Sequence, residues 1–443
     1  MLLSIPTIVY GQQVATSKKV LRLSPQKAVA GAPLFHLLPP EEEQEAGNAV
    51  PVMLRMVYEQ TAFMKDIYPK LGDYAEMDVN DPKFKEFYFA RFAEQLVRAG
   101  SMSHADWQYP LRSERPYLIL LPDLQSQRQL AGRGMTAWIR LLLSKGETDE
   151  ALRRIKAQLA CGRHCAATPI VVCHLVGLAI ANMALDNLEL AMQSEKCPNM
   201  YWSLATLPPT LHGLGPMVRW ELWASPAEMN QPLPPIGDAK WTELATRFVE
   251  LYGEVSEERY TPEEGLAVQN KMRDLAIQEL PQVFGFLETD IMKMSQEELL
   301  IMRWIYMQSD QMRTQLEPMA YQSPIEVIAV KNKLDAQIKE LLAKTGAKTS
   351  PFPLAIAQGV LVCKNFERRV KFLQTIEALR DHASKHDGHF PQTLDELELS
   401  APNDPFTEKP FLYEAMGDSA TLRQAEIDGF KTTLLPYELS ASK

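Results

Sequence analysis

The sequence predicts a mainly α-helical protein, with an irregular helical-hairpin body followed by a small α+β unit at the C-terminus. Apolar residues recur at helical spacing through most of the 443 residues. Prolines (31) outnumber glycines (21) and cluster between these periodic segments, as in helices joined by stiff loops. The tail changes to turn residues and short stretches of alternating hydrophobicity, which predict strands.

Composition limits the classes of function. Hydrophobic residues make up 46% of the chain and charged residues 23%, which predicts a folded protein with a large core. The formal net charge is −10, and Lys and Arg occur together only in short runs that cannot form a basic patch. Because nucleic-acid phosphates need such a patch, we expect no nucleic-acid partner.

The cysteines match no disulfide framework, because their number is odd and their spacings fit no known pattern. At least one is therefore expected to be free. Free cysteine is a common small core residue, and we interpret the five in this way: Cys161, Cys165, Cys173, Cys197 and Cys363.

The first residues raise the question of export. Residues 2–11 are apolar, and Val9 and Gly11 fit the −3 and −1 positions of a signal-peptidase site. The segment lacks a positive charge and is short, so it is either a signal-peptide remnant with a truncated start or an N-terminal strand. We predict a periplasmic or secreted protein.

Composition shifts and helix signals divide the chain into six segments. Prolines and an acidic run after Pro40 mark an extended N-terminal region. The predicted order is 1–12, a signal-peptide remnant; 13–47, an extended strap or linker; 48–224, a first helical domain; 225–237, a proline-rich linker; 238–352, a second helical region; and 353–443, a long helix with a small strand-bearing unit.

One helical hairpin is clear in the first helical domain. Two apolar stripes flank a turn at Lys145-Gly146, and their members are Ala131, Met135, Trp138 and Leu142, then Ala151, Leu152, Ile155 and Leu159. The pattern resembles one tetratricopeptide unit. No clean 34-residue period lies on either side, and such arrays need about three units, so we predict irregular solenoid-like packing.

The longest apolar run covers residues 170–185 and contains His174 and Asn182. It is shorter than the ~18–20 residues that a membrane span needs. We therefore predict a buried core helix here and no membrane span in the mature chain.

Helix starts are well marked. Asp81-Pro82 is an N-cap with proline at the first helical position, and an aromatic stripe at helical spacing follows it as far as Gly100. Three capping boxes, in which a Ser or Thr and a Glu three residues later cap each other's backbone, predict starts in the second helical region. These pairs are Thr261 with Glu264, Ser295 with Glu298, and Ser323 with Glu326.

The tail holds the strand-bearing unit. A long helix is expected from about residue 353 to Lys385, and residues 403–407 have the composition of a turn. Alternating hydrophobicity, which is imperfect, then predicts strands at 411–414, 420–423 and 432–439.

Searches for catalytic motifs find no nucleophile elbow, zinc-protease or dinucleotide-binding pattern. The best metal candidates are His382, His386 and His389, because the first two share a helical face and zinc needs convergent ligands. The alternative is a helix C-terminus where histidines favour the dipole and meet solvent. A second group around His164 and His174 matches no zinc spacing, and we interpret it as core. We predict no cofactor.

Most of the chain resembles a family of uncharacterised secreted proteins of planctomycete bacteria. The most specific string is Pro-Asn-Met-Tyr-Trp-Ser-Leu-Ala-Thr-Leu-Pro at 198–208, which makes Tyr201 and Trp202 candidate interaction residues. This string ends a longer matching segment at 168–208, and the others are 37–40, 47–49, 106–107, 146–159 and 377–411. The resemblance implies export and no established activity. Glu408 stands where the family tends to have glycine, which predicts a changed turn in an unchanged fold.

The tail alone resembles the C-terminal part of pseudopilins, in which a long helix leads through an Asp-Pro-aromatic turn into a small sheet. Here that turn is Asp404-Pro405-Phe406. Some pseudopilins bind calcium after this turn, but residues 417–428 lack a convincing ligand spacing. About 350 residues precede the unit, so the chain is not expected to be a filament subunit of that kind.

Three functional hypotheses follow. The first is a non-enzymatic cell-envelope protein, a protein-interaction or scaffold module with a protein partner in the envelope. The second is a metal-dependent hydrolase that uses His382, His386 and His389. The third is an accessory of a secretion or pilus-like system, by analogy with the tail.

Overall fold

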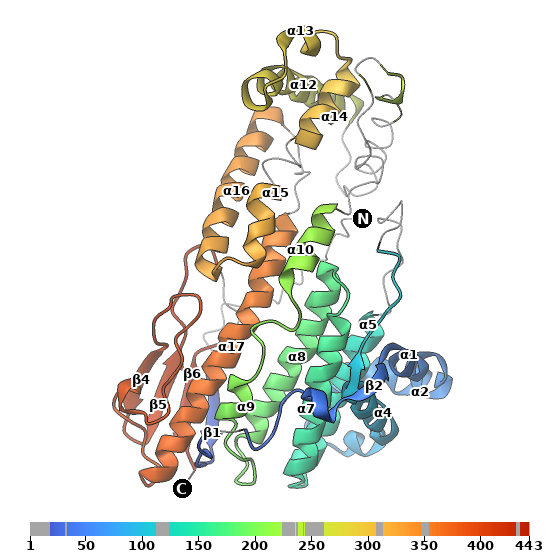
Figure 1. Cartoon of the computed structure of the whole chain (residues 1–443). Helices are drawn as coiled ribbons and strands as arrows, with labels where there is room; N and C mark the ends of the chain where they lie inside the picture. The colour runs from blue at the N-terminus through green and yellow to red at the C-terminus, as the bar shows by residue number, and fades with distance from the viewer. Residues whose placement is uncertain are drawn as a thin grey trace.

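A computed structural model describes residues 18–31, 33–111, 124–223, 235, 238–241, 243, 261–306, 313–346, 354–430 and 435–442. In this part the protein is mostly helical, with a small mixed sheet at the C-terminus, and the predicted fold class is confirmed at that level. Figure 1 shows the long helix α17 between the sheet on one side and the helices of the first half on the other. The predicted segment 1–12 lies outside the described residues, as does most of the predicted linker 225–237.

The first helical domain begins with short elements. A parallel pair of strands, β2 and β3, ties its start to the end of α4. In order the elements are η1 (Glu41–Glu43), β2 (Glu45–Asn48), α1 (Val50–Tyr58), α2 (Thr61–Asp66), η2 (Tyr68–Lys70), α3 (Leu71–Glu76), η3 (Pro82–Glu86), α4 (Ala90–Ser101) and β3 (Met102–His104).

The helix predicted to run from Asp81 to Gly100 is split in two. The Asp81 side chain caps η3 by accepting the Lys83 N–H at 2.8 Å, but extended backbone then separates η3 from α4. In extended backbone, alternate residues point to the same side. Phe87 and Phe89 are therefore both buried, with their ring centroids 5.8 Å apart, whereas Tyr88 between them is exposed. Aromatic packing therefore overrode the helical period.

Helices α7 (Thr148–Cys165) and α8 (Val171–Ala191) form the centre of this domain. They cross closely, since a Cβ atom on Gly162 would lie 2.7 Å from the carbonyl oxygen of Gly177. Helix α8 contains most of the apolar run predicted to be a core helix. Among the described helices it alone is long and apolar enough to cross a membrane, and 61% of its most apolar stretch is buried within the protein.

The predicted helical hairpin is present. The chain passes through α5 (Leu124–Gln127), the π-helical segment η5 (Arg128–Gly134) and α6 (Met135–Ser144), and then turns into α7. Gly146 has φ +73°, which suits glycine at a helix C-terminus. A tetratricopeptide or solenoid arrangement of the whole body is not confirmed.

The last two helices of the first helical domain are α9 (Tyr201–Ala205) and α10 (Leu214–Trp223).

The second helical region confirms the capping boxes. The pairs Thr261–Glu264 and Ser323–Glu326 cap α12 (Pro262–Phe284) and α16 (Pro324–Thr345) reciprocally, and Ser295 and Glu298 do the same before α14 (Gln296–Tyr306). The remaining elements are α13 (Glu288–Ile291), α15 (Arg313–Leu316) and η8 (Glu317–Ala320).

Helix α17 (Leu354–Lys385) belongs to both main hydrophobic cores. Its N-terminal half, with Ile356 and Val360, packs in a core that includes residues of α10 and α16. Its C-terminal half, with Phe372 and Ile376, packs in the larger core with α7 and α8. The predicted long helix is thus confirmed, and it links the two helical regions.

A four-stranded sheet packs against the C-terminal half of α17. Its order is β1-β6-β5-β4, with β1 parallel to β6 and the other pairs antiparallel. Gly417, with φ +64°, opens the two-residue β4–β5 turn, which fits a type II′ hairpin. The strands are β1 (Lys19–Leu23), β4 (Leu412–Met416), β5 (Ser419–Arg423) and β6 (Tyr437–Ala441), and the short helix η9 (Leu394–Glu396) precedes β4.

Candidate functional site

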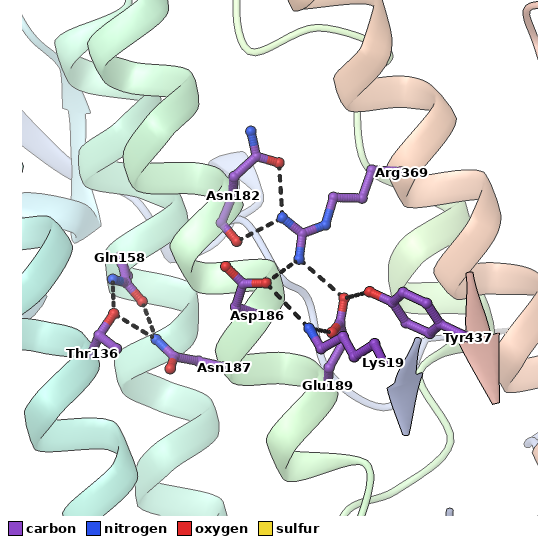
Figure 2. A network of polar contacts seen from close by, with 9 residues as sticks. All are labelled: Lys19, Thr136, Gln158, Asn182, Asp186, Asn187, Glu189, Arg369 and Tyr437. Atoms are coloured by element: carbon purple, nitrogen blue, oxygen red, sulfur yellow. Dashed lines mark hydrogen bonds and ion pairs between the residues drawn. The ribbon is translucent and has the colours of Figure 1, made fainter. Parts of the chain in front are cut away.

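A partly buried ionic network joins β1, near the N-terminus, to β6, near the C-terminus. Glu189 on α8 is fully buried, and its carboxylate binds Lys19 of β1, Arg369 of α17 at 3.0 Å and Tyr437 of β6 at 2.8 Å. Asp186, one turn earlier, accepts from Arg369 at 2.6 Å and from Lys19 at 3.4 Å. Figure 2 shows these side chains converging between α8, α17 and the two paired strands.

The network balances two cations against two carboxylates. Burial acts to lower the pKa of Arg369, but the carboxylates of Asp186 and Glu189 outweigh it and raise this pKa. Burial, with Glu189 adding to it, raises the pKa of Tyr437, so its hydroxyl stays protonated and donates to the carboxylate. With its charges paired in this way, we interpret the network as a clamp that holds β1 and β6 on the helices.

A neutral network lies on another face of α8 (Figure 2). Asn187 donates to the side-chain oxygen of Gln158 at 2.9 Å and to Thr136 at 3.1 Å. Gln158 in turn donates to the carbonyl of Gly132 at 2.9 Å, inside the π-helical segment. These bonds fix η5, α6, α7 and α8 to one another.

The strap that follows β1 is held on the C-terminal part of α17. Arg380 is fully buried, and it donates to the Ser24 carbonyl at 2.8 Å and to the Glu377 carboxylate at 2.7 Å. Asp381 accepts the Ala28 N–H at 2.8 Å. The strap therefore lies on the domain, through contacts that no local sequence signal indicated.

The Asp-Pro-aromatic turn is also anchored from α17. Arg368 donates to both carboxylate oxygens of Asp404, at 2.9 and 2.6 Å, and both side chains are buried. Asp404 also accepts the Phe406 N–H at 3.0 Å. Within this turn Glu408 has φ +57°, the left-handed region that glycine adopts without strain.

The histidines predicted as metal ligands lie at the C-terminal end of α17 but do not converge. The rings of His382 and His386 stack 3.9 Å apart, whereas His389 lies past the helix end, 3.3 Å from Asp418. Across the described ranges, no group of three or more His, Cys, Asp or Glu side chains is arranged to hold a metal ion. Burial and then His386 lower the pKa of His382.

Tyr201 and Trp202, the predicted interaction residues, belong to the interior. Tyr201 is 7% exposed and donates to the Ser400 carbonyl at 2.8 Å. Trp202 is half-buried and packs edge-on against it, with ring centroids 5.0 Å apart. The ring and hydroxyl of Tyr201 thus fasten α9 to the C-terminal unit, and the binding role stays a prediction.

The cysteines are all buried and free, as the core interpretation requires. Burial raises the pKa of the Cys161, Cys173 and Cys363 thiols to about 12. Thiols of this kind are neutral and unreactive at pH 7.

One of the two edge strands of the C-terminal sheet, β4, is the candidate functional site. In the described part of the chain, β4 pairs with β5 on one side and with no strand on the other. Leu412 and Met416 on this strand are 38% and 49% exposed. An edge strand with unpaired backbone groups and exposed apolar side chains is a template for a further strand.

Comparison with protein-family models, with curated proteins and with solved structures finds no match for this chain. The resemblances to a secreted planctomycete family and to pseudopilins therefore stay predictions.

Sequence reasoning missed both the clamp and the edge. One signal for the clamp was present, because Glu189 is a charged residue close to a long apolar run. A second signal was the alternation of Lys19–Leu23, whose leucines are buried while Val20 and Arg22 are exposed. The partner strand, more than 400 residues away, could not be read from either signal.

Proposed function

We propose that this protein is a non-enzymatic protein-interaction or scaffold module of the cell envelope, and that it binds an extended segment of a partner protein along β4. The open edge of β4 is the observation that carries the proposal. The solenoid-like body predicted from the helical hairpin is part of the same proposal, as the support that presents the edge.

The hairpin geometry shows which backbone groups are available. In a two-residue hairpin the closing pair, here Met416 and Ser419, is hydrogen-bonded, and hydrogen-bonded pairs then alternate along the ladder. Leu412 and Glu414 therefore bond to β5. The N–H and C=O groups of Tyr413 and Ala415 point to the open side.

The side chains of β4 define the chemistry of the partner. Leu412, Glu414 and Met416 are exposed on one face of the strand, whereas Tyr413 faces the other way and donates to the Pro391 carbonyl at 2.7 Å. A complementary segment would carry apolar residues beside Leu412 and Met416 and a basic residue beside Glu414. A second copy of β4 would instead bring like charges together at Glu414, so the proposal favours a different protein.

The two other hypotheses rest on weaker observations. An accessory role in a secretion or pilus-like system draws on the same unit, because a long helix leads into an anchored Asp-Pro-aromatic turn and then a sheet. That role is compatible with strand addition at β4. The metal-dependent hydrolase would need His382, His386 and His389 on one metal, and His389 faces Asp418 instead.

The test uses an apolar photo-crosslinking amino acid in place of Met416, which is 49% exposed, so that Glu414 is kept. The full chain is exposed to an extract of the cell envelope. We expect one defined partner to be captured. The variant Ala415→Pro removes a single N–H on the open side and leaves the β5 ladder intact, so it should abolish capture. Leu287→Ser, at a residue 67% exposed and outside the C-terminal unit, is the control and should keep it.

Equal capture by wild type and Ala415→Pro would contradict the proposal. Circular dichroism and thermal unfolding of each variant would confirm that the fold is retained. Stoichiometric zinc or iron in the purified protein, lost on His386→Ala, would favour the hydrolase instead.

A further inference from the structure

Three histidines from separate segments lie near one another, two of them buried and the third half-buried. His164 lies in the last turn of α7, His174 lies in the first turn of α8, and His212 lies in the loop between α9 and α10. His164 and His174 are 2% and 4% exposed, and the rings of His174 and His212 are 6.4 Å apart. We call His164, His174 and His212 the histidine junction.

The histidine junction lies where the two main cores join. Cys165, next to His164, and Leu211, next to His212, belong to the larger core. Val171, three residues before His174, and Leu214, two residues after His212, belong to the second core. Movement at the junction would therefore change how the two cores meet.

The groups around the junction favour neutral imidazoles. The positive charge of Arg163 acts on His164 and His212, and His212 acts on both other rings, with His104 also acting on His164. Hydrogen bonds to the backbone of Ala99 and of Arg163 favour the charged forms of His164 and His212 but are outweighed, because the pKa of each ring is lowered overall. Arg163 has no ion pair within the described structure, and the N-terminus of α8 adds positive potential at His174.

The acidic groups nearby do not compensate. Glu221 caps α8 by accepting the Val171 N–H at 2.7 Å, and it acts on Cys173 rather than on the imidazoles. Cys165 and Tyr109 are protonated neighbours, because burial raises both of their pKa values. Among the described residues, no carboxylate is a significant influence on the three rings.

We propose that the histidine junction is an acid-sensitive device that parts the ends of α7 and α8 from the His212 loop and so loosens the contact between the two cores. Burial lowers the pKa of His164 and of His174 to about 4, and it also lowers that of His212. An exposed histidine has a pKa of about 6.5. The closed form is therefore fully favoured above pH 6.5 and loses that advantage as the pH falls towards 4.

The size of the effect follows from these values. At pH 5 an exposed imidazole is protonated, whereas a buried imidazole with a pKa of about 4 is mostly neutral. Between pH 8 and pH 5 the opening equilibrium therefore shifts toward the open form by about 30-fold for each histidine. When both histidines become exposed in the same opening step, the two factors multiply, and the opening equilibrium shifts by roughly three orders of magnitude.

Hydrogen–deuterium exchange of the full chain at pH 8 and pH 5, corrected for intrinsic exchange, tests the proposal. We expect protection to fall at pH 5 in peptides covering 160–178 and 214–220, while the centre of α17 keeps its protection. The double variant His164→Gln/His174→Gln removes the two most deeply buried imidazoles and should abolish most of this difference. The control His382→Gln/His386→Gln leaves the junction intact and should show the wild-type response.

Two results would overturn the proposal: an even loss of protection along the whole chain, or the same response in the junction variant as in wild type. An independent measurement covers the case in which the junction variant does not fold. Titration of ¹³C-labelled histidines in the wild-type chain should give at least two imidazoles with pKa values well below the usual range, and ordinary values for all eight would also overturn it.

Discussion

Tyr437 donates a 2.8 Å hydrogen bond to Glu189, although 248 residues separate them. The bond joins β6 to the middle of a core helix. Lys19 of β1 bonds the same carboxylate, so the first and the last strands of the sheet depend on one buried group. The open edge at β4 is held in place indirectly, because β5 pairs with β6.

Replacement of Glu189 by alanine should destabilise the protein strongly. The variant Glu189→Ala leaves the buried Arg369 with Asp186 as its remaining counter-charge. Breaking a buried ion pair in this way lowers the free energy of unfolding by about 3–5 kcal/mol. Urea unfolding, followed by circular dichroism, would measure the loss. The control Glu438→Ala breaks the exposed 3.9 Å pair with Lys18, which should be worth less than about 1 kcal/mol. Equal effects would contradict the clamp.

Glu408→Gly should stabilise the protein. Glu408 has φ +57°, a conformation that costs a residue with a Cβ atom roughly 1–2 kcal/mol. Glycine removes that strain but adds freedom to the unfolded chain, so the expected net gain is about 1 kcal/mol or less. Thermal unfolding of the variant beside Glu408→Ala, which keeps the strain, would separate the backbone effect from loss of the carboxylate. No gain over Glu408→Ala would show that the turn is unstrained.

Gly162→Ala should destabilise the crossing of α7 and α8. Its methyl group would lie 2.7 Å from the Gly177 carbonyl oxygen and 3.2 Å from the Ala181 nitrogen, and backbone atoms cannot move aside cheaply. The expected cost is about 1–3 kcal/mol, despite the better helix propensity of alanine. Gly213→Ala is the matched control, because the nearest atom to its methyl group is 3.9 Å away. Denaturant titration would compare the two variants.

The five thiols should resist modification in the native protein. Burial raises the pKa of Cys161 and Cys197 to about 12, well above the usual value, and all five cysteines are buried. The Cys161 and Cys197 thiols thus support the fold fully below about pH 9, and that support falls as the pH rises towards 12. A colorimetric thiol reagent at pH 8 should detect no rapid reaction before denaturation and five thiols after it. Rapid labelling of the native chain would contradict the burial.

Helix boundaries were the most predictable part of the fold. The capping boxes at Thr261, Ser295 and Ser323 all appear as predicted, and α17 covers its expected range. Caps and helical period involve residues within a turn of one another, so a sequence contains all the information that they need. The exception at Phe87 and Phe89 arose because a cluster of aromatic rings outweighed the local helical preference.

The sites were less predictable than the helices. The histidines of α17 share a helical face as expected, but His389 turned toward Asp418, whose position depends on the β4–β5 hairpin. Tyr201, which lies in the most specific string of the sequence at 198–208, is buried and packs in the core. His212 was not a candidate at all, because only folding of the α9–α10 loop brings it to His174.

The sequence by itself determined that the chain is mostly helical, where most helices begin, and that the tail forms strands, because these properties depend on neighbours along the chain. Only the tertiary structure decided that β1 joins the C-terminal sheet, that Glu189 holds both ends together and that β4 is left as the open edge. A five-residue strand carries no information about a partner some 400 residues away. The choice is made by burial and charge pairing across the whole fold.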